Sequence, residues 1–180
     1  MREEFKGFWK TGIAFGLLSS LIYVIYLTLK FNYFWENPFM YQLSGIVTYF
    51  IFIILMVSVG VYLRNKHEFS GIGTRQLFQV FFIIILITEF TSFLYNYIYM
   101  VYINPDFTSQ YLESTVQYYL ERGHSQEDLN VHIESLDEVS NEYMSLSYHI
   151  RGSFTWVAID SIVAMLLSLF MKRPSSEEVI

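Results

Sequence analysis

Four long stretches of this chain are almost free of charged residues, and they constrain its fold more than any other feature. They cover residues 11–29, 43–63, 77–103 and 154–171, and their only charged side chains are Glu89 and Asp160. A helix needs about 20 predominantly apolar residues to cross the roughly 30 Å hydrocarbon core of a bilayer. With 53% hydrophobic residues, the composition is also too apolar for an ordinary soluble domain of 180 residues. The sequence therefore predicts an all-α membrane protein with four transmembrane helices in the lipid bilayer. Residues 1–180 are expected to form a single membrane domain.

Lysine and arginine residues are distributed unevenly between the two ends of these predicted helices. One side of a four-span arrangement receives Arg2, Lys6, Lys10, Arg64, Lys66, Arg75, Lys172 and Arg173. The other side receives Lys30, Arg122 and Arg151, and no Lys or Arg falls within a predicted span. Because an excess of Lys and Arg in short flanks marks the cytoplasmic side of a membrane, both termini are predicted to be cytoplasmic.

The segment between the third and fourth stretches, residues 104–151, is the one loop large enough to have its own structure. Residues 104–106 (Asn-Pro-Asp) are expected to end the third helix, since proline cannot continue its hydrogen-bond ladder. Apolar residues then recur at helical spacing as far as Gly123, which suits the left-handed position after a helix. Ser125 and the acids that follow it are typical of a second helix start. We therefore expect an extracytoplasmic acidic helical hairpin between spans three and four.

The acidic side chains of this hairpin form a candidate surface for a partner protein. The set consists of Glu113, Glu121, Glu127, Asp128, Glu134, Asp137 and Glu138. The hairpin could dock a basic partner, bind cations, or cover the ends of the spans with a solvated charged face, which is the common role of charged residues on helices. Their spacing does not match a calcium-binding loop.

Glu89 and Asp160 need a reason to lie within predicted spans, because a central Asp costs roughly 2.5 to 3.5 kcal/mol on insertion scales. Glu89 lies twelve positions after Leu77 and Asp160 twelve before Lys172, which places both carboxyls at about the same depth. Glu89, Ser92 and Asn96 follow a helical spacing that predicts one polar stripe on the third helix.

Two interpretations of these acids remain open. If the helix faces that carry Glu89 and Asp160 meet, low dielectric and mutual repulsion favour a shared proton or a bound cation, with Ser92 and Asn96 completing a transporter-like site. Alternatively, each carboxyl is protonated and bonded to a neighbouring hydroxyl or carbonyl, holding helices together with about 0.6 kcal/mol per bond. The pattern Gly12-x-x-x-Gly16-x-x-x-Ser20 could similarly serve packing within the bundle or dimerisation.

Several other activities find no support in the sequence. The chain has no Cys, which removes disulfides, thiolate metal sites and cysteine nucleophiles. His67, His124, His132 and His149 are expected in loops, and they lack the spacing of a metalloprotease site. We therefore predict no enzyme activity, cofactor or metal site. Aromatic residues make up 19% of the chain, and we expect them to serve packing and lipid contact rather than ligand binding. The net charge of −6 disfavours nucleic-acid binding.

Three local motifs of the chain can be compared with those of known protein families. The first is Lys10-Thr-Gly-Ile-Ala-Phe-Gly, and the second is Gln76-Leu-Phe-Gln-Val-Phe after a short basic turn with Gly71 and Gly73. The third is Tyr102-Ile-Asn-Pro-Asp-Phe, followed by the acidic helix–glycine–helix loop. Together these motifs resemble the bacterial domain-of-unknown-function family 4199. The resemblance covers most of the chain and implies a small four-span protein of the bacterial inner membrane. It implies no activity and no catalytic residues.

Three functional classes are compatible with these observations, in this order of preference. The first is a non-enzymatic partner or assembly subunit of the inner membrane, which binds another membrane protein or a second copy of itself through the acidic hairpin. The second is a small proton- or cation-coupled transporter that uses Glu89 and Asp160. A membrane-bound enzyme comes last.

Overall fold

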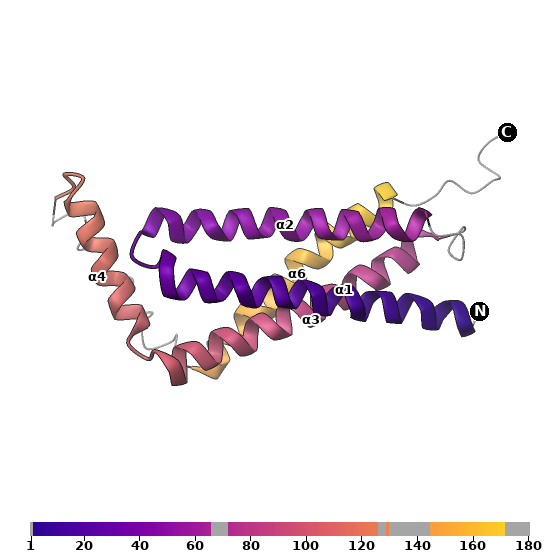
Figure 1. Ribbon diagram of the computed structural model, residues 1–180, viewed down its shortest axis with the longest axis horizontal. Coiled ribbons are helices and arrows are strands. Elements are labelled where there is room, and N and C mark those ends of the chain that lie inside the picture. Colours follow the sequence, from indigo (N-terminus) through magenta and orange to yellow (C-terminus); the bar gives the residue numbers. More distant parts are fainter. Residues whose placement is uncertain (1, 66–71, 126–128, 130–144, 172–180) are drawn as a thin grey trace.

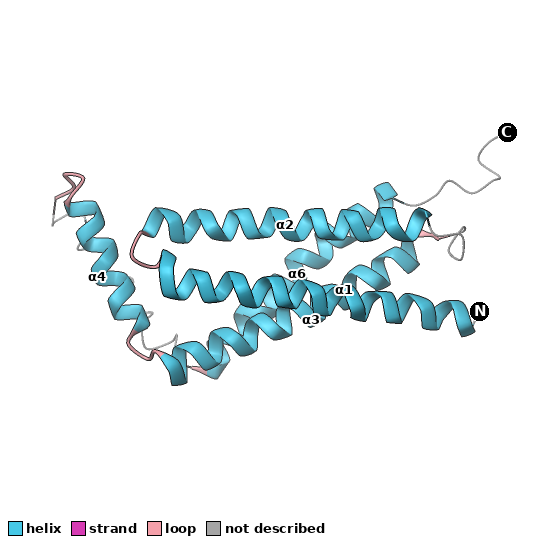
Figure 2. Cartoon of the chain, in the orientation of Figure 1, coloured by secondary structure: helices cyan, strands magenta, loops and turns pink. Residues whose placement is uncertain are grey.

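In the computed structural model, described for residues 2–65, 72–125, 129 and 145–171, every regular element is a helix. The elements in chain order are α1 (Arg2–Leu29), the π-helix η1 (Lys30–Phe34), α2 (Pro38–Asn65), α3 (Thr74–Ile98), the π-helix η3 (Tyr99–Ile103), α4 (Phe107–Leu120) and α6 (Leu146–Met171). Figure 2 shows these helices, with short loops between η1 and α2 and between η3 and α4.

Four helical segments are long and apolar enough to cross a membrane, as the sequence predicts. They are Gly7–Phe34, Pro38–Asn65, Thr74–Ile103 and Leu146–Met171. Each extends beyond the uncharged stretch that identified it, because helical hydrogen bonding continues through the flanking polar and aromatic residues. The helix α6 begins at Leu146 rather than near Phe154 and so includes His149 and Arg151.

The four long helices contact one another in the ring order α1, α3, α6, α2. The α1–α3 and α3–α6 contacts are extensive, whereas α2 packs more lightly against α6 and α1. Figure 1 shows α1 and α2 side by side, with α3 and α6 running obliquely to them. The two ends of the helix bundle differ, since α4 lies at one end and the N-terminus at the other. We refer to these as the α4 end and the N-terminal end.

The small residues of α1 explain its close packing on α3. A Cβ added at Gly16 would lie 2.8 Å from Cδ1 of Ile87, and one added at Gly12 would lie 3.1 Å from Cβ of Ile83. Ser20 donates a hydrogen bond to the carbonyl of Ile87 at 3.3 Å. The Gly12–Gly16–Ser20 face therefore serves packing within the chain.

The half of the bundle toward the N-terminal end has a filled apolar interior. Its central side chains come from the second half of α2, the first half of α3 and the second half of α6: Phe52, Met56, Val59, Leu63, Leu77, Val80, Phe81, Ile84, Ile85 and Ala164. Most of them are completely buried. This end is therefore closed by close-packed hydrocarbon, with little space for water.

An aromatic cluster attaches α4 to the other end of the bundle. Phe107 is 3% exposed and lies edge-on to Phe31 and Tyr99, with ring centroids 5.0 and 5.8 Å away. Phe31 stacks on Tyr99 at 4.6 Å, and the Tyr99 hydroxyl donates to the Phe31 carbonyl at 3.2 Å. These rings belong to the two π-helical segments η1 and η3, or to the first residue of α4, so α4 is fixed against the ends of α1 and α3.

The turns around α4 follow the predicted chemistry. The η3 helix ends at Ile103, directly before the Asn-Pro-Asp sequence, and α4 begins at Phe107. Gly123 follows α4 with φ of 86°, the left-handed conformation expected of it. The second helix of the predicted hairpin lies almost entirely outside the described residues. The same holds for the candidate partner residues Glu127, Asp128, Glu134, Asp137 and Glu138.

Candidate functional site

A cavity of about 630 Å³ occupies the half of the bundle nearer α4. All four long helices line it, and the lining residues of each helix lie mainly on the α4 side of the apolar core. Residues near its α4 end include Phe31, Tyr41, Met100 and Tyr148, whereas Glu89 and Asp160 lie nearest the apolar core. The cavity therefore runs from the α4 end toward the middle of the bundle and stops at the filled half.

Each of the four helices contributes one ionisable side chain to a polar cluster at the inner end of this cavity. The members are Tyr23 from α1, Tyr49 from α2, Glu89 from α3 and Asp160 from α6. The two carboxyls interact electrostatically with each other and with both tyrosines. Glu89 is 7% exposed and Asp160 only 2% exposed. Two acids that are distant in sequence are thus brought together at positions of low solvent exposure.

The Asp160 carboxyl is incompletely satisfied by the surrounding protein. The Tyr49 hydroxyl interacts with it, yet its Oδ1 atom has no hydrogen-bond partner among the described residues. Ala164 and Ser168 share its buried face of α6, but the Ser168 hydroxyl donates to the Ala164 carbonyl at 2.7 Å. An unpartnered buried carboxyl oxygen has a desolvation cost that a bound proton, cation or polar ligand could offset.

The other residues of the predicted stripe also line the cavity. Ser92 and Asn96 lie one and two turns from Glu89 along α3, toward the α4 end. The Asn96 amide donates to the Ser92 carbonyl at 2.8 Å and to the Ser92 hydroxyl at 3.3 Å. Glu89, Asp160, Ser92 and Asn96 therefore face one common space, as expected for a single site.

Two predictions about charged and titratable residues were wrong. His149 is not in a loop: it lies on α6, is 8% exposed and lines the cavity, because α6 starts earlier than the uncharged stretch. Lys30 is not confined to a flank, since it lies in the π-helical continuation of α1 and also lines the cavity. Its ammonium group lies 4.1 Å from the ring centroid of Tyr41. Of the other histidines, His124 is in an exposed turn, and His67 and His132 are outside the described residues.

Sequence reasoning missed the two tyrosines of the polar cluster. Tyr23 and Tyr49 are among 15 tyrosines in the chain, and both lie within apolar stretches where an aromatic side chain normally contacts lipid or core. Their positions opposite Glu89 and Asp160 depend on how the helices are arranged in space. The sequence holds no local signal for that arrangement.

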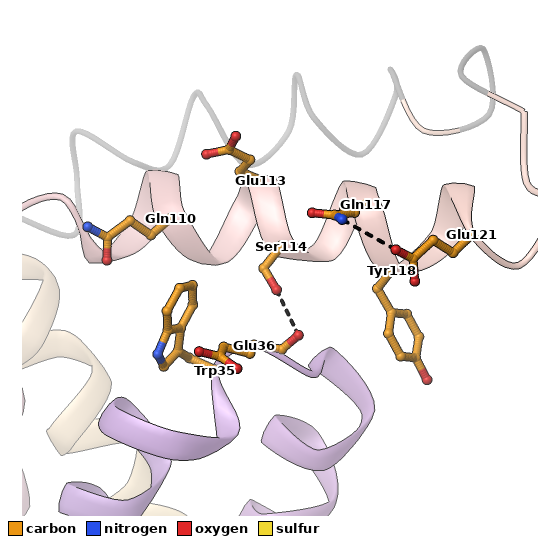
Figure 3. A pocket seen from close by; sticks show the side chains of 8 residues that line it. All are labelled: Trp35, Glu36, Gln110, Glu113, Ser114, Gln117, Tyr118 and Glu121. Atoms are coloured by element: carbon orange, nitrogen blue, oxygen red, sulfur yellow. Dashed lines mark hydrogen bonds between the residues drawn. The ribbon is translucent and has the colours of Figure 1, made fainter.

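A second, shallower pocket of about 410 Å³ lies between α4 and the turn that joins η1 to α2. Figure 3 shows its lining, in which the Ser114 hydroxyl donates to the Glu36 carbonyl at 2.8 Å. Three exposed carboxylates, Glu36, Glu113 and Glu121, surround it, and no Lys or Arg is among its lining residues. This pocket is acidic and open to solvent, and it contains the two candidate partner residues that the structure describes.

The donor sets of both pockets limit the chemistry they can support. Among the described residues, no group of three or more His, Cys, Asp or Glu side chains is arranged to hold a metal ion. The inner cavity offers two carboxyls and two phenols at one end and aromatic walls along its length. Such an arrangement can exchange protons and can hold a positively charged group.

These features define a small multi-pass helical membrane protein with a largely apolar cavity that has a polar inner end. The model of a family described as "Protein of unknown function (DUF4199)" matches residues 10–173, and the chain therefore belongs to this family. The family resemblance of the local motifs is thus confirmed. No curated protein and no solved structure matches the chain significantly.

Proposed function

We propose that this protein is a proton- or cation-coupled membrane carrier in which Glu89 and Asp160 bind and release the coupling ion. The observation that supports this proposal is the shared cavity, which brings the two acids to its inner end from different helices. Sequence reasoning alone favours a partner subunit, because a bundle of four helices has little room for an enclosed pathway. A cavity of about 630 Å³ within one chain shows that the four helices leave room for a binding site.

The pairing of the acids suits ion exchange. Two carboxylates that repel each other in a poorly hydrated site are costly to ionise together, so uptake of one proton or one cation stabilises the pair. A bound proton can then be displaced by a cation and recovered later. Intramembrane acids that line a cavity commonly mark ion pathways in membrane proteins for this reason.

The proposed orientation places the cavity toward the outside of the cell. The Lys and Arg distribution supports cytoplasmic termini, and the family resemblance supports the inner membrane of a bacterium. In that orientation the cavity lies in the outer half of the bundle, and the apolar core formed around Met56, Leu77 and Phe81 fills the inner half. Transport would then require this core to separate, and the lightly packed α2 is the helix best able to move.

A liposome experiment tests the carrier. Purified protein is reconstituted, a membrane potential is imposed, and uptake of protons and of sodium ions is followed with an internal pH dye and a radioactive tracer. We expect Glu89→Gln and Asp160→Asn to lower the active flux at least about tenfold, because each removes an ionisable group from the pathway. Glu113→Gln is the matched control, since this exposed acid on α4 lies outside the cavity. Flux that is unchanged in both cavity variants, or no faster than in empty liposomes, would contradict the proposal.

The acidic pocket beside α4 supports a second candidate function, the recruitment of a basic partner by a non-enzymatic assembly subunit. Its carboxylates Glu36, Glu113 and Glu121 are all exposed. If they recruit a partner, chemical crosslinking in native membranes followed by affinity capture should recover one stoichiometric neighbour, which is another membrane protein or a second copy. The triple variant with Gln at these positions should lose it, whereas Glu89→Gln should retain it. Recovery of no stoichiometric neighbour would count against this function.

A further inference from the structure

We infer that the inner cavity binds a small organic cation, in which one amine or quaternary ammonium group is joined to an apolar body. This inference rests on the proposed function, because it assigns the ligand of the same Glu89–Asp160 site. The volume of about 630 Å³ lies within the range of roughly 300 to 1,000 Å³ that is typical of small-molecule sites. A hydrated or bare inorganic ion would fill only a small part of it.

The charge of the ligand follows from the ionisable groups of the lining. The inner end holds two carboxyls, Glu89 and Asp160, whereas the one ammonium group, that of Lys30, belongs to the helix segment at the α4 end. When these three groups are ionised and the imidazole of His149, which also lines the cavity, is neutral, two negative groups against one positive group leave an excess of one negative charge. The buried Oδ1 of Asp160 has no hydrogen-bond partner among the described residues, and a ligand cation that reached it would supply one. A monovalent cation that reaches the acids therefore balances the site, and an anion would be repelled there.

The apolar body of the ligand follows from the walls. Aromatic rings line the cavity from the polar cluster to the α4 end, including Tyr26, Tyr41, Tyr49, Phe93, Tyr148 and Trp156. Aromatic faces attract ammonium groups through their quadrupoles and bury hydrocarbon at the same time. A cation without an apolar body would leave most of these walls without contact.

The Lys30 side chain shows that this lining already holds an ammonium group. Its Nζ lies 4.1 Å from the ring centroid of Tyr41 and 5.9 and 6.0 Å from those of Tyr26 and Phe31. Three aromatic rings of the cavity thus surround one alkylammonium group of the protein itself. A ligand cation would find the same chemistry in the aromatic rings further in, together with two carboxyls that Lys30 does not neutralise by direct contact in the structure.

Calorimetric titration of the full chain in lipid nanodiscs tests this ligand class with three probes. Benzyltrimethylammonium has both the charge and the apolar body, tetramethylammonium has only the charge, and phenylacetamide has only the ring. We expect benzyltrimethylammonium to bind at least about tenfold more tightly than either of the others, since it alone contacts both carboxyls and walls. Equal binding of benzyltrimethylammonium and phenylacetamide, or no binding of the cation, would overturn the inference.

Two substitutions with opposite expected effects on affinity test whether the probe binds in the cavity. Asp160→Asn should weaken benzyltrimethylammonium binding at least about tenfold, and Lys30→Gln should strengthen it by removing a like charge from the lining. Binding that is insensitive to Asp160→Asn would show a site elsewhere and overturn the inference. Because binding is measured without transport, the proposed ligand class and the proposed carrier function can be rejected independently of each other. Carboxyl-dependent ion flux without binding of the aromatic cation rejects only the ligand class, whereas selective, Asp160-dependent binding without flux rejects only the carrier.

Discussion

A cysteine introduced at Asp160 is expected to react with a small water-soluble thiol reagent on the order of a hundredfold faster than one introduced at Ala164. Both residues lie on the same buried face of α6, one turn apart. Asp160 lines the cavity, whereas Ala164 is 0% exposed inside the apolar core. A reagent reaches Ala164→Cys only after local opening, and about 3 kcal/mol of opening free energy slows labelling by that factor. The absence of native Cys makes each measurement specific.

The same experiment reports which end of the cavity is open. Glu89→Cys should label at a rate similar to that of Asp160→Cys, and both should be reached from the side that labels Ser125→Cys, an exposed position beyond α4. Labelling is followed by mass spectrometry in sealed membranes of known orientation. Protection of both cavity positions, with Ser125→Cys still reactive, would show that water does not enter. The acids would then be buried structural groups, and the carrier proposal would fail.

The parts of this structure that could be predicted from sequence are those with a local physical cause. The spans were recognisable because a bilayer requires long uncharged helices, and the end of η3 because proline interrupts a helix. Glu89 and Asp160 were recognisable as site candidates because a carboxyl within a span is costly wherever the helices happen to pack. Each of these inferences needs only one segment of the chain.

The parts that could not be predicted depend on how the segments meet. Tyr23 and Tyr49 acquire their significance from facing the two acids across the ring of helices, and nothing near them in the sequence differs from a lipid-facing tyrosine. His149 and Lys30 were assigned outside the spans because hydropathy detects the apolar part of a helix, whereas the helices themselves continue to residues 146 and 34. The cavity arises because side chains fill the interior of the bundle at its N-terminal end only, which is a property of the whole bundle.

Replacing Asp160 with leucine is expected to raise the free energy of unfolding while it abolishes carrier activity. Leucine branches at the same position as aspartate, and it removes a buried carboxyl whose Oδ1 lacks a partner among the described residues. Replacing a buried ion pair with apolar side chains of similar volume is often neutral or stabilising by about 1 to 4 kcal/mol, and a buried carboxyl with an unpartnered oxygen has a desolvation cost of the same origin. A functional site retains such a group despite its cost, because activity requires it. The measurement is unfolding of the purified protein in one fixed detergent, monitored by circular dichroism.

This prediction separates the two interpretations of the intramembrane acids, because they give opposite signs. If Asp160 holds helices together, Asp160→Leu must lower stability, since it removes hydrogen bonds that join α6 to its neighbours. Ser168→Ala is the matched control on the same buried face, because its hydroxyl already bonds to the Ala164 carbonyl within α6. That variant should be neutral or slightly destabilising. A loss of stability in Asp160→Leu clearly greater than in Ser168→Ala would identify the acid as structural and remove the main support for an ion-exchanging site. A gain would mean that the chain retains a destabilising carboxyl at the inner end of its cavity, as a binding site for protons or cations requires.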